Sequence, residues 1–261
     1  MLSPENHFRR VAATATMRGR LVRRRASAQA DVLQASEYEG GRRLAALLDA
    51  VARDRVDEDE EAQLALVEAG RWRILRSRDS ITGRDGRAES VARVCAQASQ
   101  PPAGARVLFH AAASWRPRSV LEMGTCVGVS AAYQASAQLL SSGGRLVGLE
   151  AYDGRAERAR SLWAECGLSE VEVQVGRFAD TLPKALADGP FDYVFVDGNH
   201  SAASTRSYVE AVSAVADPGA LLVLDDIAYS DGMRAAWHDV RHRPDVVATA
   251  DLGKIGLAVL R

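Results

Sequence analysis

The second half of the chain alternates short apolar runs with longer segments in which apolar residues recur at helical spacing. The apolar runs show little alternation of polar and apolar positions, which is typical of strands buried on both faces of a sheet. The pattern predicts strands at 119–123, 145–150, 171–175, 191–197 and 220–225, and helices at 128–140, 154–166, 180–187, 202–215 and 231–240.

Two further strands, near 245–250 and 255–260, are predicted to form a hairpin. Strands that alternate with helices require a parallel sheet covered by helices on both faces, and the hairpin adds an antiparallel edge. We therefore expect an α/β fold with a doubly wound, mostly parallel, seven-stranded Rossmann-like sheet.

The residues before this sheet divide into two parts. Residues 1–35 are rich in arginine and poor in large apolar residues, so we expect a loosely ordered segment, or one that is helical only on contact with something else. Residues 36–116 carry helical apolar patterns and are expected to form a helical layer or lid over the domain at 117–261. Within this layer we expect a loop at 82–86, followed by helices near 88–98 and 103–115. An acidic run at 54–61 is interpreted as the solvated start of a helix.

Composition excludes some classes of function. The chain has 261 residues, 47% of them hydrophobic, and a net charge of −1. These values are typical of a globular protein without a general attraction for nucleic acid or an anionic membrane. No apolar run approaches the roughly 20 residues of a membrane span. We interpret Cys95, Cys126 and Cys166 as reduced thiols of a cytoplasmic protein, because they are widely spaced and odd in number.

The first predicted strand ends in an acid and two glycines. The spacing Glu122-x-Gly124-x-x-x-Gly128-x-Ser130 lacks the close glycine pair of a dinucleotide-binding loop, although it still brings backbone near a ligand at a helix start. Glu122 suits an ammonium or hydroxyl group better than a pyrophosphate. Glu150, which ends the next strand, is placed to accept hydrogen bonds from ribose hydroxyls, but an ordinary surface acid gives the same pattern.

Three aspartates, Asp197, Asp225 and Asp226, follow later strands. Carboxylates that converge on one point repel one another unless a cation or protons intervene. Oxygen-rich clusters of this type suit Mg²⁺ or Ca²⁺ rather than zinc. The alternative is that Asp225 or Asp226 caps the following helix while Asp197 orients His200.

The run from Glu122 to Ser130 resembles motif I of class I S-adenosylmethionine-dependent methyltransferases, and in particular the catechol and caffeoyl-CoA O-methyltransferase branch and its bacterial relatives. The resemblance continues in the same order through 149–150, 176–183, 191–200 and 224–227. It implies the methyltransferase form of the Rossmann-like fold, here with a helical N-terminal extension.

By this resemblance the cofactor is S-adenosylmethionine. The backbone at Gly124 and Gly128 is expected to lie against its methionine part, with Glu122 and Ser130 at the amino and carboxylate groups and Glu150 at the ribose. The implied cofactor-binding residues are Glu122, Gly124, Thr125, Gly128, Ser130, Glu150, Arg177, Phe178 and Asp197.

The turn at 176–179 is placed at the adenine by the same resemblance. Phe178 suits a stacking or edge contact with the base. It equally suits packing beneath the sheet.

In the catechol-type branch, an acid, an acid and an amide at the strand ends bind a divalent metal that chelates two adjacent substrate oxygens. Asp226 stands at the amide position, and we expect Mg²⁺ or another divalent cation to be bound by Asp197, Asp225 and Asp226. His200 stands where the relatives have a lysine that deprotonates the substrate. We therefore predict His200 and Asp197 to be catalytic, since an imidazole exchanges protons near neutral pH. His200 also suits a metal ligand or a helix cap.

The sequence thus predicts a cytoplasmic, metal-assisted O-methyltransferase that acts on a hydroxyl of an aromatic or sugar-like small molecule, by analogy in secondary metabolism. We expect no nucleic acid or membrane partner. The arginine-rich N-terminal part is expected to supply acceptor specificity, homodimer contacts or both, and Tyr229 and Trp237 are candidate walls of the acceptor pocket.

Three other functions stay open. The first is a metal-independent methyltransferase or another S-adenosylmethionine-using transferase of the same fold. The second is a catalytically inactive, cofactor-binding regulatory protein, and the third, disfavoured by the glycine spacing, is a nicotinamide dehydrogenase.

Overall fold

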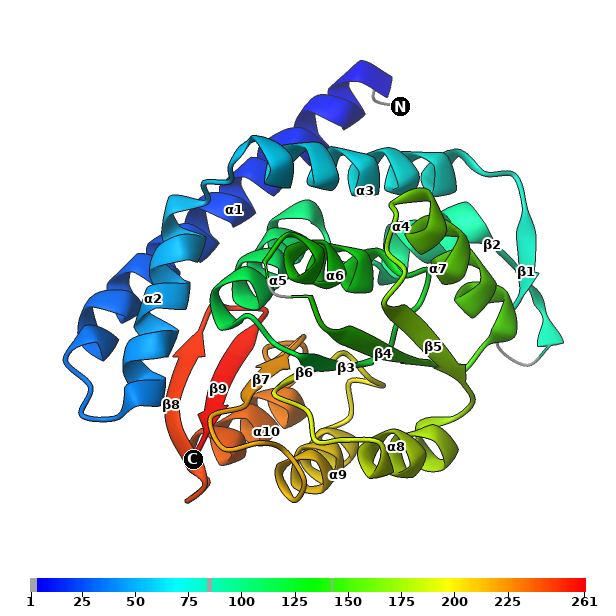
Figure 1. Ribbon diagram of the computed structural model, residues 1–261. Coiled ribbons are helices and arrows are strands. Elements are labelled where there is room, and N and C mark those ends of the chain that lie inside the picture. Colours follow the sequence, from blue (N-terminus) through cyan, green and yellow to red (C-terminus); the bar gives the residue numbers. More distant parts are fainter. Residues whose placement is uncertain (1–3, 84–85, 142) are drawn as a thin grey trace.

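The computed structural model describes residues 4–83, 86–141 and 143–261, with side chains described from residue 17 onward. Within this part of the chain the centre is a seven-stranded sheet of order β5-β4-β3-β6-β7-β9-β8 (Figure 1). β9 runs antiparallel to its neighbours β7 and β8, and the other pairs are parallel. This confirms the predicted fold class. The strands are β3 (Ser119–Met123), β4 (Arg145–Glu150), β5 (Val171–Val175), β6 (Tyr193–Val196), β7 (Leu221–Leu224), β8 (Val246–Asp251) and β9 (Gly256–Leu260).

Helices cover both faces of the sheet (Figure 1). Every residue of β6 and β7 is buried, because these strands are apolar on both faces and each face packs against helices. One face carries α5 (Pro102–Trp115), α6 (Val129–Ser141) and α7 (Asp153–Glu165), and the other carries α8 (Phe178–Ala187), α9 (Ala202–Ser213) and α10 (Asp231–Arg241).

The N-terminal part forms a helical layer over the face that carries α5, α6 and α7 (Figure 1). Its elements are α1 (Pro4–Gln34), α2 (Glu39–Arg53), α3 (Glu58–Arg76), the two-stranded sheet of β1 (Ser80–Thr82) and β2 (Ala88–Ser90), and α4 (Val91–Ala98). The acidic run supplies the start of α3 as predicted. Asp57 accepts a hydrogen bond from the Glu60 backbone at 2.9 Å, and the Glu60 side chain accepts one from the Asp57 backbone.

Residues 4–34, expected to be loosely ordered or helical only on contact with something else, form helix α1, which packs on other parts of the chain. Ala26 and Ala30 are fully buried, and α1 contacts α2, α5 and β8. Two alanines four residues apart lie on one helix face and let the helix approach its neighbours closely. The expectation of weak order came from the lack of large apolar residues, whereas the side chains that this helix buries are small alanines.

The predicted helix at 88–98 begins later, at Val91, because residues 88–90 pair with β1. Residues 84–85 of the loop predicted before it lie outside the described residues. Within the described ranges, no helix is both long and apolar enough to cross a membrane. Cys95, Cys126 and Cys166 are free and buried.

The register of β9 brings the start of that strand to the functional edge of the sheet. Gly256 lies opposite Leu224 at the carboxyl end of β7. Because the two strands are antiparallel, the residues that precede Gly256 lie beside the residues that follow Leu224. The turn between β8 and β9 therefore lies at the same edge of the sheet as the loops that follow the parallel strands.

Candidate active site

A cavity of about 850 Å³ lies at the carboxyl ends of the parallel strands, which is the usual ligand position in a doubly wound sheet. The loops after β3, β4, β5, β6 and β7 contribute to its wall, together with the segment between α4 and α5. The structure thus brings together most of the residues predicted from the sequence. Those in the wall are Gly124, Glu150, Arg177, Phe178, Asp197, His200, Asp225 and Asp226.

Gly124 has a backbone conformation that favours glycine, and its surroundings leave no room for a side chain. Its φ is +98°, and a Cβ at this position would lie 1.9 Å from the backbone oxygen of Asp197. The ends of β3 and β6 therefore meet at Gly124, and the cleft opens directly above bare backbone.

Glu150 is held by backbone donors on both sides. Its carboxylate accepts hydrogen bonds from the Cys126 backbone at 2.8 Å and from the Tyr152 backbone at 3.0 Å. Burial raises the pKa of Glu150, while these bonds and the nearby Arg155 oppose that shift. The bonds fix the orientation of the carboxylate at the cleft wall.

Phe178 has both of the environments considered for it. One side of the ring packs against the core beneath the sheet, and the residue also lines the cleft. Its ring lies edge-on to Tyr208, with centroids 5.6 Å apart and an interplanar angle of 89°. Tyr208, a further aromatic wall residue, was not singled out from the sequence.

Four predicted cofactor-binding residues lie beneath the cleft rather than in its wall. Glu122 is fully buried and accepts a hydrogen bond from Gln134 at 2.9 Å, and Thr125 and Ser130 are buried as well. Burial raises the pKa of Glu122 to about 7. Gly128 faces α7 instead of the cleft. Cofactor contact by these four residues stays a prediction.

The reason for glycine at 128 is the packing of α7. Trp163 donates a hydrogen bond to the backbone oxygen of Gly128 at 2.9 Å. A Cβ on Gly128 would lie 2.8 Å from the Cα of Ala159. The second glycine of the motif therefore allows a helix to approach the loop, a role that the spacing alone did not reveal.

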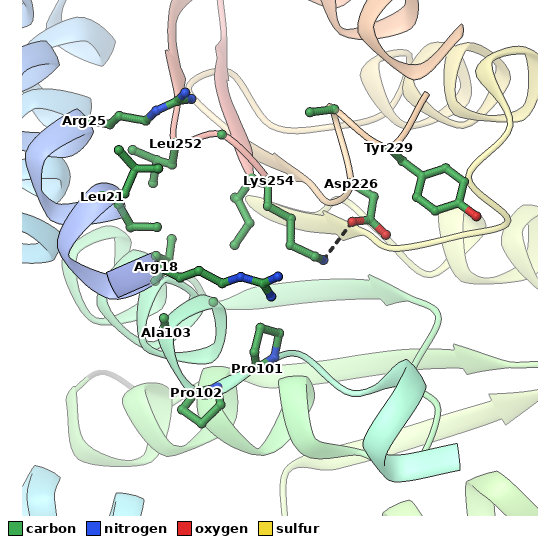
Figure 2. A pocket seen from close by; sticks show the side chains of 16 residues that line it. Arg18, Leu21, Arg25, Pro101, Pro102, Ala103, Asp226, Tyr229, Leu252 and Lys254 are labelled. Carbon is green, nitrogen blue, oxygen red and sulfur yellow. Dashed lines mark ion pairs between the residues drawn. The ribbon is translucent and has the colours of Figure 1, made fainter. Parts of the chain in front are cut away.

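The far end of the cleft holds a charged cluster around Asp225. Asp225 accepts hydrogen bonds from Gln100 and from Lys254, and the Lys254 ammonium also lies 3.1 Å from Oδ1 of Asp226. Figure 2 shows the contact between Lys254 and Asp226. Lys254 and Gln100 were not predicted. The register of the closing hairpin places Lys254 at this cluster, but that register is known only when the strand pairing is known.

Burial is the largest influence on the pKa values of the charged groups in this cluster. Burial, followed by repulsion from Asp225, raises the pKa of Asp197 well above its usual range. Burial also raises the pKa of Asp225, against the attraction of Lys254. For Lys254, burial opposes the charge, but attraction to Asp225 outweighs it and the pKa is raised. Lys254 thus stays an ammonium among the carboxylates.

His200 faces the same cluster from the loop after β6. Its Nδ1 lies 3.3 Å from Oδ2 of Asp226, and its ring centroid is 5.3 Å from that of Tyr229. His200, Asp226 and Cys126 all have positive φ, at 46°, 51° and 52°. Left-handed backbone at residues other than glycine is a strain that often accompanies functional loops, and these three residues all line the cleft.

A divalent cation at this cluster would compete with other partners for the carboxylate oxygens of Asp225 and Asp226. One oxygen of Asp225 is taken by Gln100 and Lys254, and both oxygens of Asp226 have a partner. Oδ1 of Asp225 is buried and receives no hydrogen bond from a described residue. Mg²⁺ needs about six oxygens at close range. With Lys254 in this position the described residues do not fit a metal ion, and no group of three acidic, histidine or cysteine side chains among them is arranged to hold one.

A second cavity, also of about 850 Å³, adjoins the first. Its wall is mostly apolar and is built from α1, the start of α5 and the β8–β9 turn (Figure 2). Tyr229 lines this cavity; that Tyr229 forms a wall of an acceptor pocket stays a prediction. Trp237 does not line the cavity, since it is buried in the core against Gly256. The residues that line both cavities are Arg18, Pro101, Asp226 and Lys254.

Residues 121–227 match the family model described as "Methyltransferase domain". The matched segment contains the end of β3, the strands β4, β5, β6 and β7, and all of the catalytic, cofactor-binding and metal-binding residues predicted from the sequence. Lys254, Gln100 and Arg18 lie outside it.

Known proteins are similar to the chain around this matched segment. Catechol O-methyltransferase of Mycobacterium tuberculosis is 37% identical over 123 residues, which is 47% of this chain and 54% of that protein. The match therefore spans about half the length of this curated relative.

Solved structures share the fold over a longer stretch. The O-methyltransferase TomG of Streptomyces achromogenes, involved in tomaymycin synthesis and solved with S-adenosylmethionine, is 28% identical with a TM-score of 0.55, covering 79% of this chain and 91% of TomG. An O-methyltransferase of Bacillus cereus in complex with SAH is 23% identical with a TM-score of 0.56, covering 79% and 92%. The second likeness concerns the fold alone.

Proposed function

We propose that this chain is an S-adenosylmethionine-dependent O-methyltransferase that transfers a methyl group to a hydroxyl of a small molecule. The observation that carries the proposal is the position of the cleft. It opens at the strand ends of the segment that matches a methyltransferase domain, above Gly124 and beside Glu150. TomG, which has the same fold, was solved with the cofactor bound.

The cleft fits such a cofactor in size and in chemistry. Its volume of about 850 Å³ lies in the usual range for small-molecule sites. Glu150 offers a fixed carboxylate for ribose hydroxyls, Phe178 an aromatic surface for the base, and Gly124 open backbone for the methionine part. When bound, the cofactor supplies a methyl group on a sulfonium, whose carbon–sulfur electron pair returns to sulfur as the methyl leaves.

The adjoining cavity supplies a place for the acceptor. An apolar body fits among residues such as Leu21, Val107 and Ile255, and its hydroxyl then lies where the two cavities share Asp226 and Lys254. Holding the hydroxyl at this boundary brings it next to the cofactor cleft, and such positioning supplies a large part of the rate of a two-substrate reaction.

His200 takes the proton of that hydroxyl in this proposal. Nδ1 of His200 faces Oδ2 of Asp226 at 3.3 Å, which favours the tautomer with its proton on Nδ1. Nε2 is then the nitrogen that accepts the hydroxyl proton while the acceptor oxygen bonds to the methyl carbon. Asp226 acts as a positioning residue because it orients the ring.

Three measurements test this function. Calorimetry with S-adenosylhomocysteine is expected to detect one site, and titration with NAD none. Incubation with S-adenosylmethionine and a panel of phenols and sugars is expected to yield a product heavier by one methyl group. His200→Ala is expected to lower kcat about 100-fold or more at neutral pH. Cofactor binding without methyl transfer to any acceptor favours the regulatory alternative, and near-normal turnover of His200→Ala removes the histidine from the mechanism.

Magnesium dependence stays a prediction from the sequence. The contacts of Lys254 with Asp225 and Asp226 favour the metal-independent alternative. Location in the cytoplasm, a role in secondary metabolism and homodimer contacts also stay predictions.

A further inference from the structure

Lys254 lies in the turn between β8 and β9, outside the matched methyltransferase domain, and its side chain reaches the carboxylates that follow β7. We propose that the ammonium of Lys254 takes the place of a divalent cation, and that its remaining N–H binds the acceptor oxygen. The inference rests on the proposed function where it concerns the acceptor. The replacement of a divalent cation by Lys254 does not depend on the proposed function.

The carboxylates need a cation, and Lys254 supplies one. The side chain of Asp225 is only 2% exposed, and Asp197 and Asp226 lie close enough to affect its charge and that of Lys254. Lys254 contacts Asp225 and Asp226 at the same time. A second cation between these two carboxylates would have to displace the ammonium or bind against its charge.

The position of Lys254 is fixed by the backbone around it. Its carbonyl accepts a hydrogen bond from the Ile227 backbone at 3.0 Å, directly after the two aspartates. Asp251 closes the turn by accepting from the Gly253 backbone at 2.7 Å. The ammonium is therefore carried by a turn that is tied to the strand end it serves.

Helix α1 anchors the same turn from the other side. Gln29 exchanges two hydrogen bonds with the backbone of Asp251, at 2.9 and 2.8 Å. Arg25 forms an ion pair with the Asp251 side chain at 3.1 Å. Figure 2 shows Arg25 and Leu21 of α1 on one side of the cavity and Lys254 on the other. The N-terminal helix thus holds the lysine in place.

The number of donors predicts how the acceptor binds. An ammonium has three N–H donors, and two of them are directed at Asp225 and Asp226. The third is left at the boundary of the two cavities, where the acceptor hydroxyl is placed. A single donor holds one oxygen, whereas a metal ion with open positions can hold two. The acceptor class is therefore a molecule with one reacting hydroxyl, which needs no second hydroxyl beside it.

Binding of Mn²⁺, measured by electron paramagnetic resonance on the full chain, tests the cation directly. Wild type is expected to leave Mn²⁺ free, and Lys254→Met to bind it, because the carboxylates then lack a counter-ion. Lys184→Met is the matched control, since Lys184 is exposed and is the only other lysine. Mn²⁺ binding by wild type at the Asp225 cluster overturns the proposal, and so does a Lys254→Met protein that is folded by circular dichroism but binds no Mn²⁺.

Turnover tests the contact with the acceptor. Wild type and Lys184→Met are expected to keep full activity in excess chelator, with monohydroxy and vicinal dihydroxy acceptors alike. Lys254→Met is expected to lose about 100-fold or more in kcat, the usual cost of losing one pre-positioned donor to a developing or ionised oxygen. Lys254→Gln, which keeps N–H donors without the charge, is expected to be almost as slow.

The two proposals fail in different ways. Loss of wild-type activity in chelator, restored by Mg²⁺, overturns the lysine proposal and leaves the methyltransferase function intact. Failure to bind S-adenosylhomocysteine overturns the function, and the Mn²⁺ experiment still decides the role of Lys254.

Discussion

In the proposed function the cleft has a cofactor half and an acceptor half, which are built in different ways. The cofactor half, lined by Gly124, Glu150 and Phe178, comes from loops that follow successive parallel strands. The acceptor half, at Arg18 and Lys254 and the apolar cavity behind them, comes from segments more than two hundred residues apart. The cofactor half lies inside the matched domain, and these parts of the acceptor half lie outside it.

This difference separates the residues whose position follows from the sheet topology from those whose position depends on the docking of distant segments of this chain. A strand end is fixed by the sheet, so residues there keep their place in any chain with this topology. Residues on a long helix and on a hairpin turn meet only if the whole N-terminal layer docks as it does here. We expect substitutions in the cofactor half to affect folding and cofactor binding, and substitutions in the acceptor half to affect the choice of acceptor.

The largest effect is expected at Gly124. Gly124→Ala places a Cβ against the backbone oxygen of Asp197 in a left-handed conformation, and should lower the free energy of unfolding by about 3 kcal/mol or more. Gly167→Ala is the matched control, because Gly167 also has positive φ, at 70°, but open space around it. Urea unfolding measures both variants. Equal losses would show that backbone strain alone, and not the contact of β3 with β6, requires glycine at 124.

The next effect concerns the buried acid beneath the cofactor half. Burial raises the pKa of Glu122 from 4.5 to about 7. The unfolded chain therefore releases this proton at lower pH than the folded one, so stability is lost as the pH rises from about 4.5 to about 7. Glu122→Gln should be more stable than wild type at pH 8, by up to about 3 kcal/mol, with little difference near pH 4. Thermal unfolding across this range checks it, with the exposed Glu172→Gln as control; a difference that does not change with pH contradicts the shift.

Glu150 tests whether the cofactor half binds the ribose. Glu150→Ala should weaken binding of S-adenosylhomocysteine by about 1–3 kcal/mol, the cost of losing a buried hydrogen-bonding acid. The same variant also frees the backbone donors of Cys126 and Tyr152, so Glu150→Gln, which keeps an acceptor oxygen, should lose less. Calorimetry measures both, and unchanged affinity in Glu150→Ala removes this residue from the site.

The smallest effect is expected in the acceptor half. Arg18 lines both cavities and has no hydrogen-bond or ion-pair partner among the described side chains. Arg18→Ala should raise KM for an acidic acceptor by at most about fivefold, since the contact is solvated, and leave KM for a neutral acceptor unchanged. Arg20→Ala, also exposed on α1, is the control. An equal rise in KM for acidic and neutral acceptors would mean that Arg18 contributes to the shape of the cavity and does not recognise the charge of the acceptor.

The sequence predicted the sheet closely because its strands are short apolar runs that differ from the helical patterns between them, and the central strands β6 and β7 are buried throughout. β3, β4 and β5 begin and end at the predicted residues, and the closing hairpin is antiparallel as expected. The motif from Glu122 to Ser130 was found from the sequence, but its spacing did not show that its two glycines face different neighbours. Gly124 faces the cleft and Gly128 faces α7. Spacing alone does not tell which neighbour a glycine serves.

By itself, then, the sequence determined the order of strands and helices, the resemblance of residues 121–227 to a methyltransferase domain and the carboxylates at the strand ends. It did so because these features depend on local patterns and on a topology that the patterns imply. Only the tertiary structure decided that α1 is a docked helix and that Lys254 neutralises Asp225. The physical reason is that both depend on contacts between distant segments, whose geometry follows from the packing of the whole chain.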